Sequence, residues 1–357
     1  MPNEIEVEVE VQECDRYWCD NTFPVGEGTE VDGGEWCDDC VSDYAVGCDR
    51  CGELVADTHT VDGEEWCTNC TDDDAFWCAY CDCYYDPHGW SNEHDHDNGC
   101  LLDYNDTPLL RFRGEDPHGY YLGLELEMED TSGCSISDGV ELAGSHIPDH
   151  FYCKSDGSLY EGMEMVSHPM TLSYWQQIRP RFDSLTAGLR RMGMRSWNTE
   201  TAGIHVHVSS EAFESDAHLW MFQRLFYRNP DQVSKFAGRE SSRWAQIRPE
   251  KGEITHYTKQ RKQGNHSHLP RYMAVNLTNR STVEIRVFRG SLNPNRVFAN
   301  LEFVHAAVEY TRTLTIKQAH AGALDFSIFA YWLRQQPQYA NAAAHLSARG
   351  LVSAGND

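Results

Sequence analysis

Positive charge is nearly missing from the first part of this 357-residue chain. Residues 1–100 contain 28 Asp and Glu against only Arg16 and Arg50, a balance of −26, whereas residues 101–357 contain 28 acidic and 27 basic residues, a balance of −1. A surface this acidic repels phosphate backbones, so we do not expect nucleic acid as a partner. The asymmetry predicts two different kinds of domain, and it is compatible with a basic protein partner or a salt-adapted host.

Long apolar runs and the common nucleotide loops are also absent. No stretch approaches the roughly eighteen apolar residues of a membrane span, and the start, MPNEIEVEVEV, has no basic segment followed by an apolar one. We therefore expect no signal peptide, no membrane span and a cytoplasmic protein. The chain has no GxxxxGK[ST] motif, no GxGxxG that opens a helix and no serine-hydrolase elbow. A nucleotide would have to be held by metal ions and side chains instead.

Cysteine is plentiful, and its spacing repeats. Fourteen cysteines in a chain that we expect to be cytoplasmic indicate metal thiolates rather than disulfides. The segment VDGGEWCDDC at 31–40 recurs as VDGEEWCTNC at 61–70, and the CxxC pair at 48–51 recurs at 78–81. Each unit predicts two zinc knuckles of zinc-ribbon type around an Asp-Gly hairpin turn. Closed four-thiolate sites leave no open position for catalysis, so this zinc would be structural.

The predicted zinc ligands form three sets. The first is Cys14, Cys19, Cys37 and Cys40, and the second is Cys48, Cys51, Cys67 and Cys70. The third begins with Cys78 and Cys81 and closes with Cys100 and either His96 or His94, with Cys83 as a competing ligand. Pairing of Cys37 and Cys40 with Cys48 and Cys51 stays open as an alternative.

The second part of the chain is organised around GLELEME at 123–129. Apolar residues alternate there with glutamates, which sends Glu125 and Glu127 to one face of a strand. Carboxylates held this close repel each other unless they are solvated or share a divalent cation. Three more strands repeat the pattern: GMEMVSHP with Glu164, GIHVHVSS with His205 and His207, and TVEIRVFRG with Glu284 and Arg286. One sheet whose polar face forms a metal and anion site explains all four.

Helices are expected between and after these strands. Apolar residues at three- and four-residue spacing predict amphipathic helices over 172–194, 214–228, a segment after Pro294 and a last one around 326–332. After Pro294 the apolar residues lie on one side. The resulting fold class is α+β, with a largely antiparallel sheet and helices on one face, preceded by small cysteine-rich repeats. We predict an acidic arm or edge strand at 1–12, zinc repeats at 13–100, a Pro- and Gly-containing linker at 101–119 and a catalytic domain at 120–357.

These motifs resemble a known family. GLELEME, KSDGSL, GMEMVSHP, GIHVHVSS and STVEIRVFRGSLNPN, in this order over about residues 120 to 310, are similar to the amidoligase family of phage and bacterial proteins. That family shares the carboxylate-amine ligase fold of glutamine synthetase and glutamate-cysteine ligase. The resemblance implies an antiparallel sheet with magnesium or manganese ions at an ATP site. It also implies a reaction in which ATP phosphorylates a carboxylate and an amine displaces the phosphate to give an amide.

The resemblance also implies roles for individual residues. Glu125 and Glu127 match paired ligands of two separate metals; His205 and Glu284 match partners of the first, and Glu164 matches a ligand of the second. His207 matches a histidine near the ATP phosphates, and Arg286 matches an arginine that would neutralise the transferring phosphoryl group or grip a substrate carboxylate. The remaining matches are substrate-side residues Asp156 and Ser158, anion contacts Lys154 and Arg289, and nucleotide or substrate contacts Arg271 and Asn276. Glu129 matches no ligand. The insertion at 131–150 and the zinc repeats lie outside the pattern, so the substrates, an amino acid, a peptide or a protein, stay open.

Two other functions remain as alternatives. A zinc metallohydrolase would use His205, His207 and a glutamate, and a non-catalytic scaffold would use the zinc repeats to bind a protein. Zinc in the sheet site would favour the first. A sheet that binds neither ATP nor magnesium would favour the second.

Overall fold

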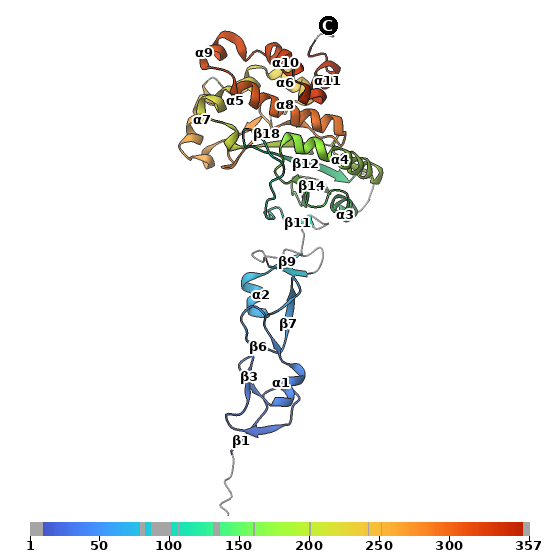
Figure 1. Cartoon of the computed structure of the whole chain (residues 1–357), viewed down its shortest axis with the longest axis vertical. Helices are drawn as coiled ribbons and strands as arrows, with labels where there is room; N and C mark the ends of the chain where they lie inside the picture. Colours follow the sequence, from blue (N-terminus) through green and yellow to red (C-terminus); the bar gives the residue numbers. More distant parts are fainter. Residues whose placement is uncertain are drawn as a thin grey trace, which may run out of the picture. The chain divides into compact units, whose positions relative to one another are not determined.

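The structure, a computed structural model, divides into two compact units, Met1–Asp95 and His96–Asp357 (Figure 1). We call them the cysteine-rich unit and the sheet unit. The structure describes residues 10–78, 83–86, 101–105, 107–130, 136–159, 161–199, 201–241, 243–250 and 252–352. None of the helices within these ranges has both the length and the apolar composition that a membrane crossing needs.

The cysteine-rich unit consists of short strands and two short helices. Its described strands are β1 (Val11–Glu13), β2 (Thr22–Pro24), β3 (Thr29–Val31), β4 (Gly34–Trp36), β5 (Val46–Gly47), β6 (Leu54–Val55), β7 (Thr58–Val61), β8 (Glu64–Cys67), β9 (Phe76–Cys78) and β10 (Cys83–Tyr85). Its helices are α1 (Asp38–Tyr44) and α2 (Thr68–Asp74). The pairing of β1 with β2 makes the end of the predicted acidic arm an ordered strand.

The predicted Asp-Gly turns are confirmed. Asp32-Gly33 joins the antiparallel strands β3 and β4, and Asp62-Gly63 joins β7 and β8. All four turn residues have positive φ, between 49° and 89°. A two-residue turn of this kind matches the right-handed twist of the strands that it joins, and it favours Asp or Asn followed by Gly.

The turn aspartates also connect one repeat to the next. Oδ2 of Asp32 accepts a hydrogen bond from the backbone N–H of Ala56 at 2.7 Å, and Oδ2 of Asp62 accepts one from Asp86 at 2.8 Å. Each bond spans 24 residues, so the junction repeats together with the sequence. The same hydrogen bond, from a backbone N–H of one repeat to the turn aspartate of the repeat before it, therefore occurs at both junctions.

The sheet unit is built on eight described strands in the order β11-β13-β14-β12-β16-β18-β17, with β15 paired to β12. These strands are β11 (Leu101–Leu102), β12 (Leu122–Asp130), β13 (Phe151–Lys154), β14 (Gly162–Ser167), β15 (Met194–Arg195), β16 (Gly203–Ser209), β17 (Val275–Asn276) and β18 (Thr282–Arg289). Only β11 and β13 pair in parallel among them. The predicted α+β class with a largely antiparallel sheet is confirmed.

Helices cover the apolar face of this sheet. The described α-helices are α3 (Ile136–His146), α4 (Leu172–Met192), α5 (Asp216–Arg228), α6 (Pro230–Ala237), α7 (Glu253–Lys262), α8 (Pro294–Arg312), α9 (Ile316–Gln318), α10 (Phe326–Arg334) and α11 (Ala340–Ala348). The apolar residues of β12 are fully buried beneath them, and the indole N–H of Trp175 on α4 donates to the carbonyl of Leu122 at 3.4 Å. The predicted helices over 172–194, 214–228 and 326–332 are thus confirmed as α4, α5 and α10.

Helix α8 differs from the prediction of one apolar side. Fourteen of its residues are buried, because it lies between the sheet and the helices α10 and α11 (Figure 1). The carboxylate of Glu302, inside this helix, accepts from Asn341 Nδ2 at 2.6 Å and from the backbone N–H of Ala342 at 2.8 Å. A carboxylate at the N-terminal end of α11 satisfies N–H groups that have no partner within that helix.

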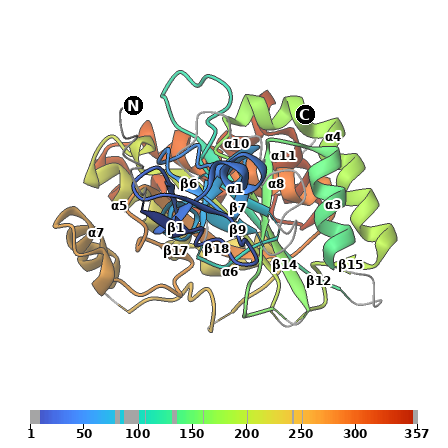
Figure 2. The ribbon, with the colours of Figure 1, turned by 90° about the horizontal axis from the view of Figure 1, so that it is seen from below.

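One predicted boundary needs correction. Leu101–Leu102 forms β11 against β13, and the guanidinium of Arg113 donates to the carbonyl of Asp149 at 2.8 and 3.0 Å, so the predicted linker at 101–119 is partly built into the sheet unit. The insertion at 131–150 contains α3, which packs alongside α4 (Figure 2). Gly188 of α4 permits this approach, because an added Cβ would lie 2.7 Å from Leu142 of α3.

Candidate active site

The polar residues of five neighbouring strands lie in register across the sheet. Glu127 of β12 is opposite Glu164 of β14, and Glu125 is opposite His205 of β16. Across the strands from β14 to β17, the residues of this row are Glu164, Glu127, Glu125, His205, His207, Glu284 and Asn276. Side chains on one face of a sheet at this spacing can share a ligand. Residues from four separate motifs therefore form one site, as their alternation predicted.

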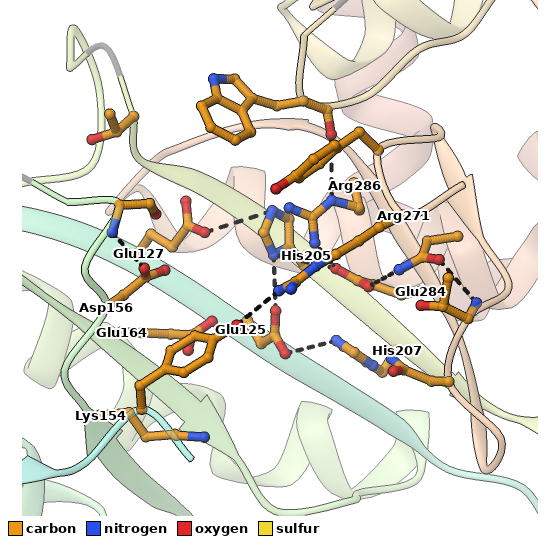
Figure 3. A pocket seen from close by; sticks show the side chains of 18 of the residues that line it. Glu125, Glu127, Lys154, Asp156, Glu164, His205, His207, Arg271, Glu284 and Arg286 are labelled. Atoms are coloured by element: carbon orange, nitrogen blue, oxygen red, sulfur yellow. Dashed lines mark hydrogen bonds and ion pairs between the residues drawn. The ribbon is translucent and has the colours of Figure 1, made fainter. Parts of the chain in front are cut away.

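This row lines a cavity of about 760 Å³ (Figure 3). The predicted residues that line it are Glu125, Glu127, Lys154, Asp156, Ser158, Glu164, His205, His207, Arg271, Asn276, Glu284 and Arg286. The cavity has carboxylates on β12 and β14 and guanidinium groups toward β18 (Figure 3). Groups of both signs, facing one space, suit a ligand made of cations and phosphates.

The first cluster that could hold a cation consists of Glu125, His205 and Glu284, whose ligand atoms all lie within 4.8 Å of one another. Nδ1 of His205 lies 2.8 Å from Oε2 of Glu125 and 3.5 Å from Oε1 of Glu284. Glu284 is held from its other side, because its Oε2 accepts from Asn276 Nδ2 at 2.7 Å. Hydrogen bonds of this kind fix the orientation of a metal-binding carboxylate.

The second cluster consists of Glu127, Glu164 and again His205, within the same 4.8 Å limit. Nε2 of His205 lies 3.7 Å from Oε1 of Glu127. A neutral imidazole has a single lone pair, so His205 can serve only one cluster at a time while its other nitrogen carries the proton. The two clusters therefore compete for one ligand.

The electrostatics of the row show an excess of negative charge. Burial raises the pKa of Glu125, but the charge of His207 and hydrogen bonds from both histidines outweigh burial and hold that pKa well below its usual value. Burial and then the charges of Glu125 and Glu127 raise the pKa of Glu164 well above its usual value. Against its own burial, His207 has a pKa raised to about 9 by Glu125. A divalent cation in the second cluster would relieve the repulsion on Glu164.

Four basic side chains border the carboxylates. Arg286 forms an ion pair with Glu284, and its Nε donates to the carbonyl of Trp244 at 3.3 Å. Arg271 donates from Nη2 to the hydroxyl of Tyr104 at 3.0 Å, and the ammonium of Lys154 lies 5.7 Å from the centre of the same ring.

The fourth is Arg239, which the sequence analysis missed. It follows α6 and donates from Nη2 to the carbonyl of Arg286 at 2.8 Å, while its buried Nε has no hydrogen-bond partner among the described residues. Gly203 leaves room for it, because an added Cβ would lie 3.0 Å from both Nη atoms. A guanidinium beside the second cluster is a candidate contact for an anionic ligand.

Arg289 does not line the cavity. A register shift between β16 and β18 places it opposite Gly203, near the end of the sheet, where its Nη2 donates to Asn198. The prediction that Arg289 contacts the anion is therefore not supported by its position. Asp156 and Ser158 do reach the cavity, on a turn in which the backbone N–H of Ser158 donates to Oδ1 of Asp156 at 2.8 Å.

The other lining residues that sequence reasoning missed come mainly from loops. They are Tyr104, Asn105, Gly157, Thr201, Trp244, Tyr272, Thr278 and Asn279. Loops have no periodic pattern, so neither alternation nor helical spacing could identify them. Trp244 and Tyr272 lie in separate loops, and their rings meet with centres 5.3 Å apart. Tyr272 follows Arg271 directly, so its place beside a predicted site residue was the one available signal.

The cysteines assemble as the first two predicted sets. The thiols of Cys14, Cys19, Cys37 and Cys40 lie within 4.8 Å of one another, and so do those of Cys48, Cys51, Cys67 and Cys70. The alternative pairing of adjacent knuckles is not the one that the chain adopts. Backbone N–H groups turn toward the sulfurs, for example Cys67 N to Cys48 Sγ at 3.2 Å, and such bonds favour the thiolate that zinc binds.

The third predicted set lies largely outside the described residues. Cys81, His94, His96 and Cys100 fall there, as does the side chain of Cys78. Cys83 is described, in β10, opposite Cys78 of β9.

Comparisons with known proteins assign the sheet unit. A crystal structure of a bifunctional glutathione synthetase from Pasteurella multocida matches with 13% identity and a TM-score of 0.41, over 65% of this chain and 47% of that one. The chain thus spans about half the length of that protein, and a similarity this distant carries no functional argument. No match was found among curated protein sequences.

A family model described as "Putative amidoligase enzyme" matches residues 125–308, more than half of the chain. The match includes all five strands of the polar row except the start of β12. The chain therefore belongs to this amidoligase family, as its motifs predicted.

Proposed function

We propose that this protein is an ATP-dependent carboxylate-amine ligase that forms an amide or isopeptide bond through an acyl phosphate. The observation that supports this most strongly is the register of the sheet, which gathers two carboxylate clusters and their shared His205 beside the guanidinium of Arg286. An amidoligase needs such a combination, because a carboxylate becomes reactive only when phosphate is moved onto it. The substrate carboxylate would belong to an amino acid, a peptide or a protein.

The donor set fits magnesium or manganese. Carboxylate oxygens with one imidazole are hard ligands, whereas zinc prefers sites richer in nitrogen or sulfur. We propose that Glu125, His205 and Glu284 hold one ion and that Glu127 and Glu164 hold another. When bound, these ions would neutralise the phosphates of ATP and stabilise the charge that develops on the transferred group.

The basic side chains would orient the anions. Arg286, fixed by Glu284 and by the carbonyl of Trp244, and Arg239, fixed by the carbonyl of Arg286, present guanidinium groups to the cavity. We propose that His207 and Lys154 contact phosphate, that Arg271 and Asn276 contact nucleotide or substrate, and that Asp156 and Ser158 lie on the substrate side. Asn276 also orients Glu284, so its loss would disturb both roles.

The proposed chemistry has two balanced steps. A carboxylate oxygen of the substrate attacks the γ-phosphorus, the bond from that phosphorus to the bridging oxygen breaks, and ADP leaves with the electron pair. The nitrogen of an amine then attacks the acyl carbon, the bond from carbon to the phosphate-bearing oxygen breaks, and inorganic phosphate leaves. The proton that the amine loses passes to the departing phosphate or to solvent. Holding the substrate carboxylate beside the two clusters and the arginines would lower the barrier of the first step, because these groups stabilise the charge that develops there.

A zinc hydrolase is the weaker candidate. It requires His205 and His207 on one ion, but among the described residues the converging clusters include His205 alone. His207 faces Oε1 of Glu125 at 2.9 Å through Nε2 and the hydroxyl of Thr282 at 3.1 Å through Nδ1. His207 thus lies outside both clusters, so we assign it to phosphate contact rather than to metal binding.

The test is a screen of amino acids and peptides for magnesium-dependent release of ADP, with the amide product identified by mass spectrometry. Arg286→Lys keeps the charge but loses the two-pronged contact, so we expect it to lower turnover by about a hundredfold. Zinc-dependent amide hydrolysis without nucleotide would support the hydrolase. Absence of both ATP and magnesium binding in the intact protein would support the scaffold.

For the cysteine-rich unit we propose two structural zinc ions in the described tetrads and a protein partner for its acidic surface. Thiolate ligands of this kind persist in a reducing compartment, so we propose a cytoplasmic location.

A further inference from the structure

The first two cysteine repeats have the same internal contacts. Oδ2 of Asp15 accepts from the N–H of Glu35 at 2.8 Å, and Oδ2 of Asp49 accepts from Glu65 at the same distance. In the same way Cys37 N donates to Cys14 Sγ at 3.3 Å. These pairs align Cys14-Asp15 with Cys48-Asp49, although the loops that follow differ in length.

The arginines that follow the aspartates align as well. The guanidinium of Arg16 lies over the rings of Trp36 and Tyr44, at 5.7 and 3.4 Å, and that of Arg50 lies over Trp66 at 4.9 Å. The second loop then closes at once with Cys51. The first loop contains two more residues before Cys19.

These two residues are Tyr17 and Trp18, at the tip of the β1–β2 hairpin. Their rings contact each other edge to face at 4.7 Å, and the residues are 79% and 87% exposed. The second repeat closes its cysteine tetrad without them, so the tetrad does not require the pair. Burying a Trp and a Tyr is worth several kcal/mol, yet the fold leaves both in water.

The backbone at this tip has a strained conformation that keeps the two aromatic rings exposed. Trp18 has a φ of 70°, in the left-handed region that a bulky side chain rarely occupies. The N–H of Cys19 nonetheless donates to the carbonyl of Arg16 at 3.0 Å, which closes the loop around the aromatic pair. A costly conformation that presents two exposed rings is expected where the rings contact another molecule.

The charge around the tip selects the chemistry of that molecule. Asp15 and Asp20 flank the pair and are exposed. The two arginines of residues 1–100 are engaged within the unit, Arg16 on rings and Arg50 also with Asp74 at 3.1 Å. The acidic surface therefore attracts a cationic partner and repels phosphate-bearing ones. Aromatic faces bind Arg and Lys side chains by cation–π contact, as Arg16 and Arg50 already show here.

We propose that the Tyr17–Trp18 tip is a docking site for a protein segment that carries Arg or Lys. The aromatic rings provide the contact that depends on position, and the surrounding carboxylates provide attraction over a longer range. This inference rests on the partner role proposed for the cysteine-rich unit and does not depend on the ligase chemistry.

The test measures binding of short fluorescent peptides to the full-length protein without ATP. The probes are a peptide of alternating Arg and Gly, the same peptide with Lys in place of Arg, and a third with Glu in place of Arg. We expect the wild-type protein to bind the first two, more weakly at higher salt, and not to bind the third.

Two variants remove aromatic rings from the tip, and each leaves a loop that can still close the cysteine tetrad. Trp18→Gly suits the left-handed backbone, and deletion of Tyr17 and Trp18 gives the first loop the length of the second. Each should weaken binding by about tenfold, whereas Tyr331→Ser, at a similarly exposed aromatic residue on α10, should not. Zinc content and ATP turnover should be unchanged in all three, which separates this inference from the ligase proposal.

Wild-type affinity in both tip variants would overturn the proposal, because the attraction would then be a property of net charge alone. Binding to single-stranded DNA or to phosphatidylcholine vesicles that depends on Trp18 and exceeds binding to the peptides would also overturn it. These outcomes would assign the tip to base stacking or to a lipid surface.

Discussion

The two units bury different kinds of side chain, and the difference distinguishes the roles that we propose for a metal in each. In the cysteine-rich unit each buried cluster is small and combines zinc-tetrad cysteines with a few apolar side chains, Val31 and Trp36 in the first and Val55, Val61 and Trp66 in the second. In the sheet unit a continuous apolar core lies between the sheet and its helices, and the candidate metal ligands lie on the opposite face. We infer that metal in the first unit replaces a core, whereas metal in the second serves chemistry.

Removal of zinc should produce the largest effect and would test this contrast directly. Cys48→Ser takes one thiolate from the second tetrad, so we expect that repeat to lose its fold and the chain to lose about one zinc ion, because structural zinc contributes on the order of 10 kcal/mol. Amide hydrogen exchange should rise throughout β7 and β8 and stay unchanged in β12. Cys153→Ser, in β13 of the sheet unit, is the matched control, and equal exchange in both variants would contradict the contrast.

Neutralising the carboxylates of the sheet should have the opposite result, a loss of activity without a loss of folding. Glu125→Gln, Glu164→Gln and Glu284→Gln should each lower magnesium-dependent ATP turnover by at least about a hundredfold while the unit stays folded, since Gln keeps the shape but loses the charge. For Glu164→Gln the ion-free protein should even become slightly more stable, because a repelled carboxylate is removed.

The control for these variants lies on the same strand. Glu129 accepts a hydrogen bond from Thr201 and belongs to neither cluster, and Gln can accept that bond as well. Glu129→Gln should therefore retain most of the turnover. Full activity in Glu125→Gln as well would show that the polar face is an ordinary sheet surface.

A smaller effect is expected where the sheet unit uses a carboxylate for structure. Glu302→Ala removes the acceptor that holds Asn341 and the N–H of Ala342, so the free energy of unfolding should fall by about 2 kcal/mol. Denaturant titration measures this. Glu141→Ala, on the exposed side of α3, should change it by less than about 0.5 kcal/mol, and a comparable loss there would remove the role assigned to Glu302.

The smallest effect that we expect is on how the free energy of unfolding changes at mildly acidic pH. Burial lowers the pKa of His218, which donates from Nε2 to the carbonyl of Val308 at 3.0 Å. The unfolded chain therefore accepts a proton on His218 at a higher pH than the folded protein does. The neutral His218 contributes to the free energy of unfolding above the unfolded pKa of about 6.5, and this contribution is lost as the pH falls through the folded pKa. In His218→Gln the decline in unfolding free energy between neutral and mildly acidic pH should be smaller, by at most about 1 kcal/mol. His256→Gln, exposed on α7, should follow the wild type.

The site was predictable to the extent that its residues lie on regular strands. Alternation placed Glu125, Glu164, His205 and Glu284 on polar faces, and antiparallel pairing then brought those faces together. Arg289 was assigned to the anion through the resemblance, but it is the last residue of β18, opposite Gly203, and does not line the cavity. Alternation indicates the face on which a residue lies but not how far along its strand it lies from a site. Arg239 reaches the site from the end of a helix, so its position depends on tertiary packing that spacing does not encode.

The helices show the same limit. The apolar stripe of α4 is strictly periodic, and its boundaries are fixed by Thr171, which accepts from the N–H of Tyr174, and by Gly193 in the left-handed region. Helix α7 is mostly polar, with Ile254 and Thr258 as its buried residues, so its sequence has no clear period. Helix α8 has buried apolar residues outside its expected face, and this second face packs against the helices α10 and α11.

The junction between cysteine repeats has a consequence for how this unit can change length. Asp32 and Asp62 each bind a backbone N–H of the following repeat, and a backbone donor is present whatever side chain occupies that position. Duplication of one thirty-residue segment would therefore supply both the acceptor and the donor of a new junction without any compensating substitution. The unit can grow or shrink by whole copies, so the number of copies is a property that selection can adjust separately from the chemistry of the sheet.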